Sequence, residues 1–268
     1  MAVNFDGTND VISVVRDSSI EPAAITISAW VNTDTAVNGA YTIASKPFTS
    51  FSDPYYSYQL RLDNSGGIRV FWVVVPAAYA GRSENIHIAG GNISTGVWSH
   101  IVVSYDDNAG DGKRSKMYID GAEVSTNNVS LTIAYHNMPL TLGRTETIGW
   151  YFNGKINETA IWDVALTSAE VAQLYNSKVK GMPLQIQSTN LQSYYPFDDH
   201  PHSDVADSAN TLVFKDQSSN SNDGTASGCN AQAEEVLSYP ANVIIPGYST
   251  GAAPSITRRN RMMLCIGT

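Results

Sequence analysis

Apolar and polar residues alternate in short runs along the first two thirds of the chain, as in β-strands with one buried face. Two such runs, 58–62 and 68–72, flank the turn sequence Asn-Ser-Gly-Gly at 64–67. Asp-Gly at 120–121 divides another pair in the manner of a two-residue hairpin. Residues 155–161 alternate in the same way. The pattern therefore predicts an all-β protein in which two antiparallel sheets form a sandwich.

One helix start interrupts this strand pattern. The run that ends near Trp162 is followed by Thr167, which can cap a helix, and by Glu170 three residues later. This spacing is that of a capping box, in which each residue hydrogen-bonds the backbone of the other. The sequence therefore predicts one short helix over about 167–176, directly after a strand.

The chain divides into three regions of different character. Residues 1–178 contain the predicted sandwich, and residues 179–239 form a flanking segment with further strand-like runs. This segment could add edge strands to the same sandwich or begin a second copy of it. The chain that follows is too short for a second core, so the first interpretation is preferred.

Residues 240–268 are predicted to form an extended C-terminal arm. Pro240, Pro246 and Pro254 interrupt regular structure, and three arginines between 258 and 261 precede the apolar residues 262–266. An apolar terminus of this kind should be buried, either on its own sandwich or on a neighbouring subunit. We therefore expect a homo-oligomer or docking within a larger shell.

Composition and charge narrow the range of partners. The formal net charge is −9, which disfavours non-specific nucleic-acid binding. No apolar run reaches the roughly 18 residues of a membrane span. Cys229 and Cys265 are the only cysteines and lack a metal-binding spacing. Met1 leads straight into the first predicted strand; if it is the natural start, export through an ordinary signal peptide is not expected.

Six segments carry short motifs in a fixed order. They are FDGTNDVI at 5–12, ITISAWV at 25–31, GVWSHIVVSYD at 96–106, KMYIDG at 116–121, LTLGR at 140–144 and FNGKINETAIWDVALTSAEV at 152–171. This set resembles the laminin-G-like jelly-roll family of the concanavalin A-like lectin and glucanase superfamily. The resemblance implies a jelly-roll sandwich over residues 1–178 and favours binding over catalysis.

The resemblance also implies a calcium ion near the first and last of these strands. Carried over residue by residue, its ligands would be Asp6, Asp10, Asn157 and Glu158, with carbonyls or waters completing the six to eight oxygens that calcium prefers. Asn157 stands where the family pattern has aspartate, which should weaken the site. The competing interpretation is that these residues only cap turns and strand ends.

Aromatic residues in predicted loops are candidates for ligand contact. Tyr55, Tyr56, Trp150 and Tyr151 could stack on sugar rings where loops gather at one end of a sandwich. A retaining glycosidase would instead need two carboxylates about 5–5.5 Å apart. Glu158 has Ala160 at the position two residues on, and no nucleophile elbow occurs. We therefore expect a protein that is not an enzyme.

Three functions remain open from the sequence. The preferred one is a virion component, a capsid-decorating or tail-associated protein of a bacteriophage, that docks on other virion subunits or on itself through the arm and binds cell-surface glycans. The alternative is a secreted, calcium-dependent carbohydrate-binding module. A glycoside hydrolase is the least favoured.

Overall fold

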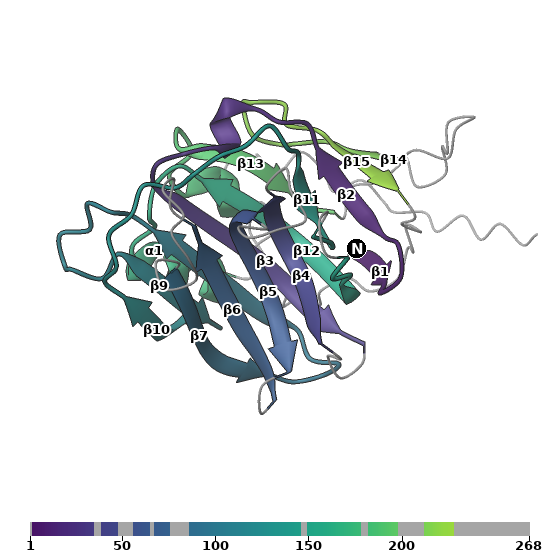
Figure 1. Ribbon diagram of the computed structural model, residues 1–268, viewed down its shortest axis with the longest axis horizontal. Helices are drawn as coiled ribbons and strands as arrows, with labels where there is room; N and C mark the ends of the chain where they lie inside the picture. Colours follow the sequence, from purple (N-terminus) through teal and green to yellow (C-terminus); the bar gives the residue numbers. More distant parts are fainter. Residues whose placement is uncertain are drawn as a thin grey trace, which may run out of the picture.

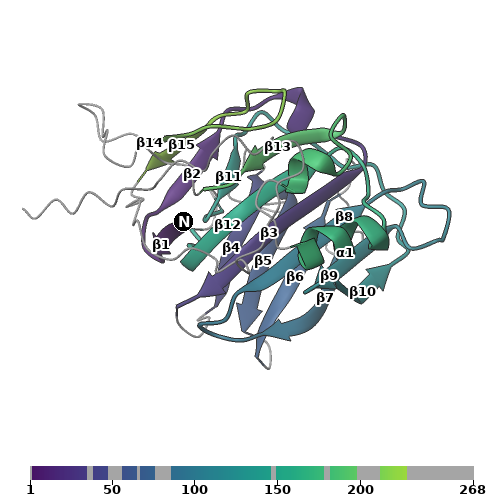
Figure 2. The same ribbon diagram turned by 180° about the vertical axis from the view of Figure 1, so that it is seen from behind.

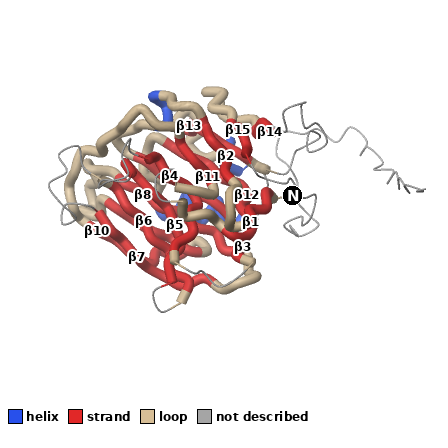
Figure 3. Tube along the Cα trace, turned by 45° about the vertical axis from the view of Figure 1, so that its right-hand side comes forward, coloured by secondary structure: helices blue, strands red, loops and turns tan. Residues whose placement is uncertain are grey.

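The computed structural model of the protein describes residues 2–34, 39–47, 56–64, 67–75, 86–145, 149–177, 182–197 and 212–227. Within these residues two antiparallel β-sheets pack face to face, and one α-helix, α1 (Ser168–Ser177), lies outside them (Figure 1). Figure 3 shows strands in both layers. The predicted all-β jelly-roll sandwich with one short helix is confirmed.

Sheet A contains seven strands in the described part of the chain. Six follow the order β1-β12-β3-β8-β9-β10, and β13 pairs with β12 on the same side as β1. Their bounds are β1 (Val3–Asp6), β3 (Ile25–Thr33), β8 (Ser99–Tyr105), β9 (Ser115–Ile119), β10 (Ala122–Asn127), β12 (Asn153–Trp162) and β13 (Leu191–Tyr195).

Sheet B contains eight strands within the same described ranges, in the order β14-β15-β2-β11-β4-β5-β6-β7. Their bounds are β2 (Val11–Val14), β4 (Ala40–Pro47), β5 (Tyr56–Asn64), β6 (Ile68–Val74), β7 (Ile86–Ile93), β11 (Leu140–Leu142), β14 (Leu212–Phe214) and β15 (Gly224–Ser227). The 3₁₀ turns η1 (Ser18–Ile20) and η3 (Met182–Gln185) lie in connections between described strands. Sheet B faces the viewer in Figure 1.

The hydrophobic core lies between the sheets and is built from every second residue of the strands. In β3, the inward residues Ile25, Ile27, Ala29 and Val31 are fully buried. In β5, Tyr58, Leu60 and Leu62 point inwards and are likewise fully buried. Because successive side chains of a strand point to opposite faces, the residues between them lie on the outer faces of the sandwich.

Helix α1 begins at the predicted cap and covers the outer face of sheet A (Figure 2). The backbone nitrogen of Thr167 donates to Oε2 of Glu170 at 2.8 Å, and the nitrogen of Glu170 donates to Oγ1 of Thr167 at 3.3 Å. These two bonds confirm the capping box. Val171 and Leu174 pack in an apolar cluster with Trp162 of β12, so α1 covers the outer side of sheet A.

Residues 191–227 add strands to both sheets of the sandwich. β13 pairs with β12 of sheet A, and the β14-β15 hairpin pairs with β2 of sheet B. Asp216 joins the two additions because its Oδ1 accepts from the nitrogens of Tyr194 and Ser218, each at 2.8 Å. The stretch from Asp216 to Asp223 lies between β14 and β15, and Asp216 is buried within it.

The predicted C-terminal arm, residues 240–268, lies outside the described residues. Its docking on its own sandwich or on a neighbouring subunit therefore stays a prediction, and so does assembly into an oligomer. In the described ranges, no helix has the length and apolar character needed to cross a membrane.

Candidate ligand-binding site

The outer face of sheet B carries a group of aromatic, arginine and amide side chains near its middle. Leu60 and Leu62 of β5 point into the core, so Gln59 and Arg61 of the same strand point outwards. Phe71 of β6 lies directly opposite Arg61 in the strand register. We call Tyr56, Gln59, Arg61, Phe71 and Trp150 the Arg61 cluster.

Arg61 is the centre of this cluster. Its guanidinium carbon lies 5.0 Å from the ring centre of Phe71 and 4.9 Å from that of Trp150, so two aromatic rings contact the cation. Such contacts stabilise a cation by its attraction to the electron-rich ring faces. Nη1 donates to Oε1 of Gln59 at 2.8 Å and to the hydroxyl of Tyr56 at 3.4 Å. The side chain is therefore held in one orientation from three sides.

The segment 143–152 carries Trp150 onto the sheet. Its ends are closed by a hydrogen bond from the nitrogen of Phe152 to the oxygen of Gly143, at 2.7 Å. The nitrogen of Thr42 in β4 donates to the oxygen of Trp150 at 3.3 Å. These bonds fix the backbone beside the sheet and place the indole over Arg61.

A buried hydroxyl network supports the cluster from below. The hydroxyls of Thr42 and Thr145 lie 2.7 Å apart, and Nε2 of Gln59 donates to both of them. Because both donor hydrogens of Gln59 are used there, its Oε1 is left to accept from Arg61. These bonds join β4 and β5 to Thr145 beneath the Arg61 cluster.

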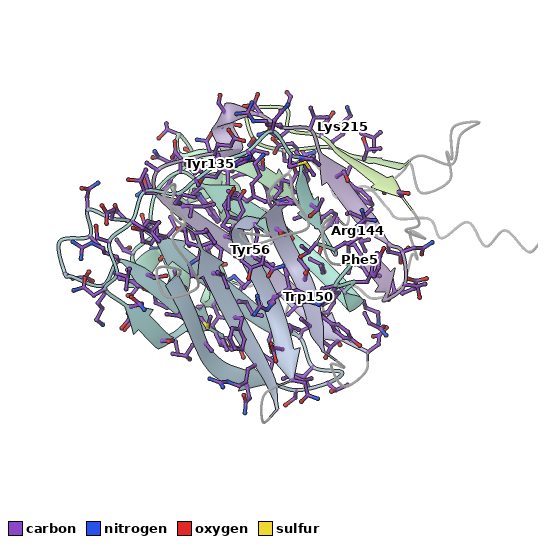
Figure 4. The ribbon with its side chains drawn as sticks, viewed as in Figure 1. Phe5, Tyr56, Tyr135, Arg144, Trp150 and Lys215 are labelled. Atoms are coloured by element: carbon purple, nitrogen blue, oxygen red, sulfur yellow. The ribbon has the colours of Figure 1, made fainter. Side chains whose placement is uncertain are left out.

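Further arginine and aromatic residues flank the Arg61 cluster. The guanidinium of Arg69 lies 5.8 Å from the ring centre of Phe71, and that of Arg144 lies 5.6 Å from the ring centre of Tyr151. In Figure 4, Tyr56 and Trp150 lie over the middle of sheet B, with Arg144 beside them. Ring faces and fixed hydrogen-bond donors in one place suit a ligand that has apolar ring surfaces and polar substituents.

The structure brings together two of the four predicted ligand-contact residues. Tyr56 and Trp150 are far apart in sequence and meet at Arg61. Tyr151 lies next to them, against Arg144, whereas Tyr55 falls outside the described residues. Sequence reasoning missed Gln59, Arg61 and Phe71. Their signal was present, because alternation with buried leucines already placed Gln59 and Arg61 on the outer face of a strand.

The predicted calcium ligands fall into two separate places. Asp6 pairs with Asn153 in the register of β1 and β12, and the pairing ends with Val3 opposite Ile156. Asn157 therefore lies four residues along β12 from the partner of Asp6, which is about 13 Å at the usual rise of a strand. The expectation that all four residues share one coordination shell is corrected by this register.

Asp6 and Asp10 already serve as hydrogen-bond acceptors in their own turn. Oδ1 of Asp6 accepts from the nitrogen of Thr8, and Oδ2 of Asp10 accepts from the nitrogen of Asp6, both at 2.7 Å. Asp10 is buried, and burial raises the pKa of its carboxyl. In the described ranges no group of three or more acidic, histidine or cysteine side chains could hold a metal ion. The residues present do not fit the implied calcium shell, and calcium binding by the chain stays a prediction.

Asn157 and Glu158 form a bulge in the centre of sheet A. The register between β12 and β3 shifts between Asn157 and Ala160, and Glu158 has a positive φ of 47°. Oε2 of the buried Glu158 accepts from the hydroxyl of Tyr194 at 2.6 Å. A bulge accommodates an extra residue and re-aims its side chain. Here it directs Glu158 to Tyr194 of the neighbouring strand β13, away from Asp6.

Comparison with known proteins identifies the class of this chain. The family model Laminin_G_3, described as the concanavalin A-like lectin/glucanases superfamily, matches residues 6–172. The chain belongs to this superfamily. A search of curated proteins finds no match.

Solved structures show the same fold. A candidate carbohydrate binding protein from Bacteroides ovatus superimposes with a TM-score of 0.58 at 21% identity, over 85% of this chain and 58% of that one. The CBM40 of the Ruminococcus gnavus IT-sialidase gives a TM-score of 0.51 at 12% identity, over 65% of this chain and 96% of its own. The chain thus spans less than two thirds of the Bacteroides protein.

Proposed function

We propose that this protein is a non-enzymatic lectin-like module that binds glycans on the outer face of sheet B through the Arg61 cluster. The observation that carries the proposal is the half-buried Trp150 ring, which packs on Arg61 together with the ring of Phe71 and the hydroxyl of Tyr56. Sugars present CH-rich ring faces that stack on aromatic rings and hydroxyls that need fixed polar partners.

Two further points support binding without catalysis. The five side chains of the Arg61 cluster are rings, an amide and a guanidinium, and none is a carboxylate that could serve as acid, base or nucleophile in glycoside hydrolysis. The two solved structures of the same fold are described as a candidate carbohydrate binding protein and as a CBM40 bound to α2,3-sialyllactose.

Affinity electrophoresis in gels containing a panel of polysaccharides tests this proposal. Trp150→Ala should weaken retardation by roughly tenfold or more, because truncating a central aromatic anchor removes most of the contact energy. Trp30→Ala is the matched control, since Trp30 is also half-buried but lies on the outer face of sheet A, stacked on Tyr175 of α1. The proposal fails if no polysaccharide retards the protein, or if Trp30→Ala abolishes retardation and Trp150→Ala does not.

A place on a bacteriophage particle is a narrower proposal, and it depends on the C-terminal arm. It is compatible with glycan binding, because a lectin-like sandwich can serve as a host-attachment domain. Deleting residues 255–268 tests the arm. A shortened protein that folds but no longer assembles would support docking on other subunits, and unchanged folding and assembly would remove the basis for this role. The alternative is that the protein is a secreted carbohydrate-binding module and lies outside the cell.

A further inference from the structure

Arg61 carries a buried charge with no acidic partner in the described structure. The residue is 8% exposed, and among the described residues its guanidinium forms no ion pair with a carboxylate. Among the bonds between described residues, only Nη1 of Arg61 donates, to Gln59 and Tyr56. Nε is enclosed and has no acceptor. The edge formed by Nε and Nη2 therefore presents donors that the described residues do not satisfy.

The Nε–Nη2 edge of an arginine favours one kind of ligand group. Burying a charge without hydrogen-bonding partners is unfavourable, and the rings of Phe71 and Trp150 offer attraction but no lone pairs. The planar guanidinium presents two parallel N–H donors that match the two oxygens of a carboxylate. Gln59 and Tyr56 hold Nη1, so the Nε–Nη2 edge is fixed in direction before any ligand arrives.

The charges around Arg61 add to this preference. Arg69 and Arg144 flank the cluster, and Asp63 lies opposite Arg69 in the strand register. Among the described residues at this place, three positive charges and one negative charge leave an excess of two positive charges, on a protein with a formal net charge of −9. An anionic ligand is therefore attracted to this face and repelled by much of the remaining surface.

We infer that the site recognises an acidic sugar, whose carboxylate accepts hydrogen bonds from the Nε–Nη2 edge of Arg61 while its ring stacks on the exposed part of Trp150. This inference rests on the proposed glycan-binding function and names the class of sugar. Because Nε is enclosed, a side chain packed on Arg61 must shift as the carboxylate enters, and we assign this movement to Trp150, whose ring centre lies 4.9 Å from the guanidinium carbon. Binding should therefore change the fluorescence of Trp150, and Trp150→Phe should remove that change.

Matched ligands test the inference directly. Polygalacturonate, hyaluronan and polysialic acid are compared with the same polymers after chemical reduction of each carboxylate to a primary alcohol. The wild-type protein should bind at least one acidic polymer about tenfold or more tightly than its reduced form, because a charge-assisted bidentate contact contributes at least that much. Arg61→Lys should lose this preference although it keeps the charge, because lysine lacks the planar fork.

Arg69→Gln is the matched control, since it removes a charge of the same sign from the rim. It should reduce the preference less than Arg61→Lys does. An equal or larger loss in Arg69→Gln would overturn the role of the fork. If Arg61→Lys does not fold, the salt dependence of wild-type binding decides: between roughly 50 and 500 mM NaCl, affinity should fall for the acidic polymer and stay constant for the reduced one.

The remaining outcomes separate the inference from the function on which it rests. Equal binding of acidic and reduced polymers overturns recognition of the carboxylate and leaves glycan binding standing. If neither these polymers nor a panel of neutral polysaccharides binds, the proposed function fails together with the inference.

Discussion

Replacing Gly143 by alanine should destabilise the protein and disturb the Arg61 cluster together. Gly143 has a positive φ of 82° and opens the segment 143–152 that carries Trp150. A Cβ added at Gly143 would overlap the ring of Phe5, closer than side chains approach in folded proteins. Phe5 is fully buried and packs edge-on against Phe152, so its ring has little space to yield.

The cost can be estimated from two physical terms. The left-handed backbone conformation costs a residue with a Cβ about 1–2 kcal/mol. Forcing an added methyl group into a packed core costs about 1–3 kcal/mol. Gly143→Ala should therefore lower the free energy of unfolding by about 2–5 kcal/mol. For a domain of this size each kcal/mol lowers the melting temperature by about 2–4 °C.

Gly96→Ala separates the two terms. Gly96 has a similar φ of 73°, but no atom lies within 4 Å of the position that a Cβ would take. In urea titrations monitored by tryptophan fluorescence, Gly96→Ala should lose only the free energy of the backbone term, and Gly143→Ala should lose the sum of the backbone and packing terms. Equal losses in the two variants would refute the argument from Phe5, and no loss in either would refute both terms. In the glycan assay, Gly143→Ala should bind more weakly than Gly96→Ala.

Three further predictions concern buried charges and calcium. The side chain of Lys46 is 0% exposed, and its Nζ lies 2.9 Å from Oε1 of Glu21. Glu21→Gln should therefore lower the free energy of unfolding, measured by urea titration, by about 3–5 kcal/mol, because it leaves a buried charge unpaired. The double variant Glu21→Gln with Lys46→Met should recover most of the lost stability, and no recovery would contradict the pairing of Lys46 with Glu21. Burial lowers the pKa of His100 to about 3 from an ordinary 6.5, so only the unfolded chain takes up this proton between pH 7 and 5. Stability should then fall by about 2 kcal/mol over that range, and a His100→Gln variant with the same fall would exclude this cause. If the chain binds calcium, adding the ion to EDTA-treated protein should raise the melting temperature. A rise that is lost in Asp10→Asn would place the ion in the Asp6–Asp10 turn. No rise in the unsubstituted protein would exclude calcium binding.

Local sequence signals determined the secondary structure and the class of fold. Alternation in 155–161 predicted a strand, and Thr167 with Glu170 predicted the helix that follows it. Both signals depend on contacts within a few residues, namely side-chain alternation and the reciprocal hydrogen bonds of a capping box. Such patterns lie within a short stretch of chain and do not depend on which distant segments pack together, which is why they can be identified from the sequence.

The site was only partly visible in the sequence. Trp150 and Tyr56 were candidates because they are aromatic and lie near turns. That they meet at Arg61 depends on Thr145 and Trp150 bonding to Thr42 of β4, through hydrogen bonds between residues about a hundred positions apart. Composition and periodicity do not specify such a pairing.

The sequence by itself therefore determined the strands, the single helix and the family, whereas tertiary structure decided which side chains share a surface. Asp6 and Asn157 belong to the first and the last motif of the family pattern, and although their strands β1 and β12 pair, the register of β1 against β12 separates the two residues. Register and bulges are set by packing across the whole core, because shifting a strand by one residue would turn its buried face outwards. Tertiary packing also placed Arg61 between two rings and gave it no acidic partner among the described residues, which no local pattern could have indicated.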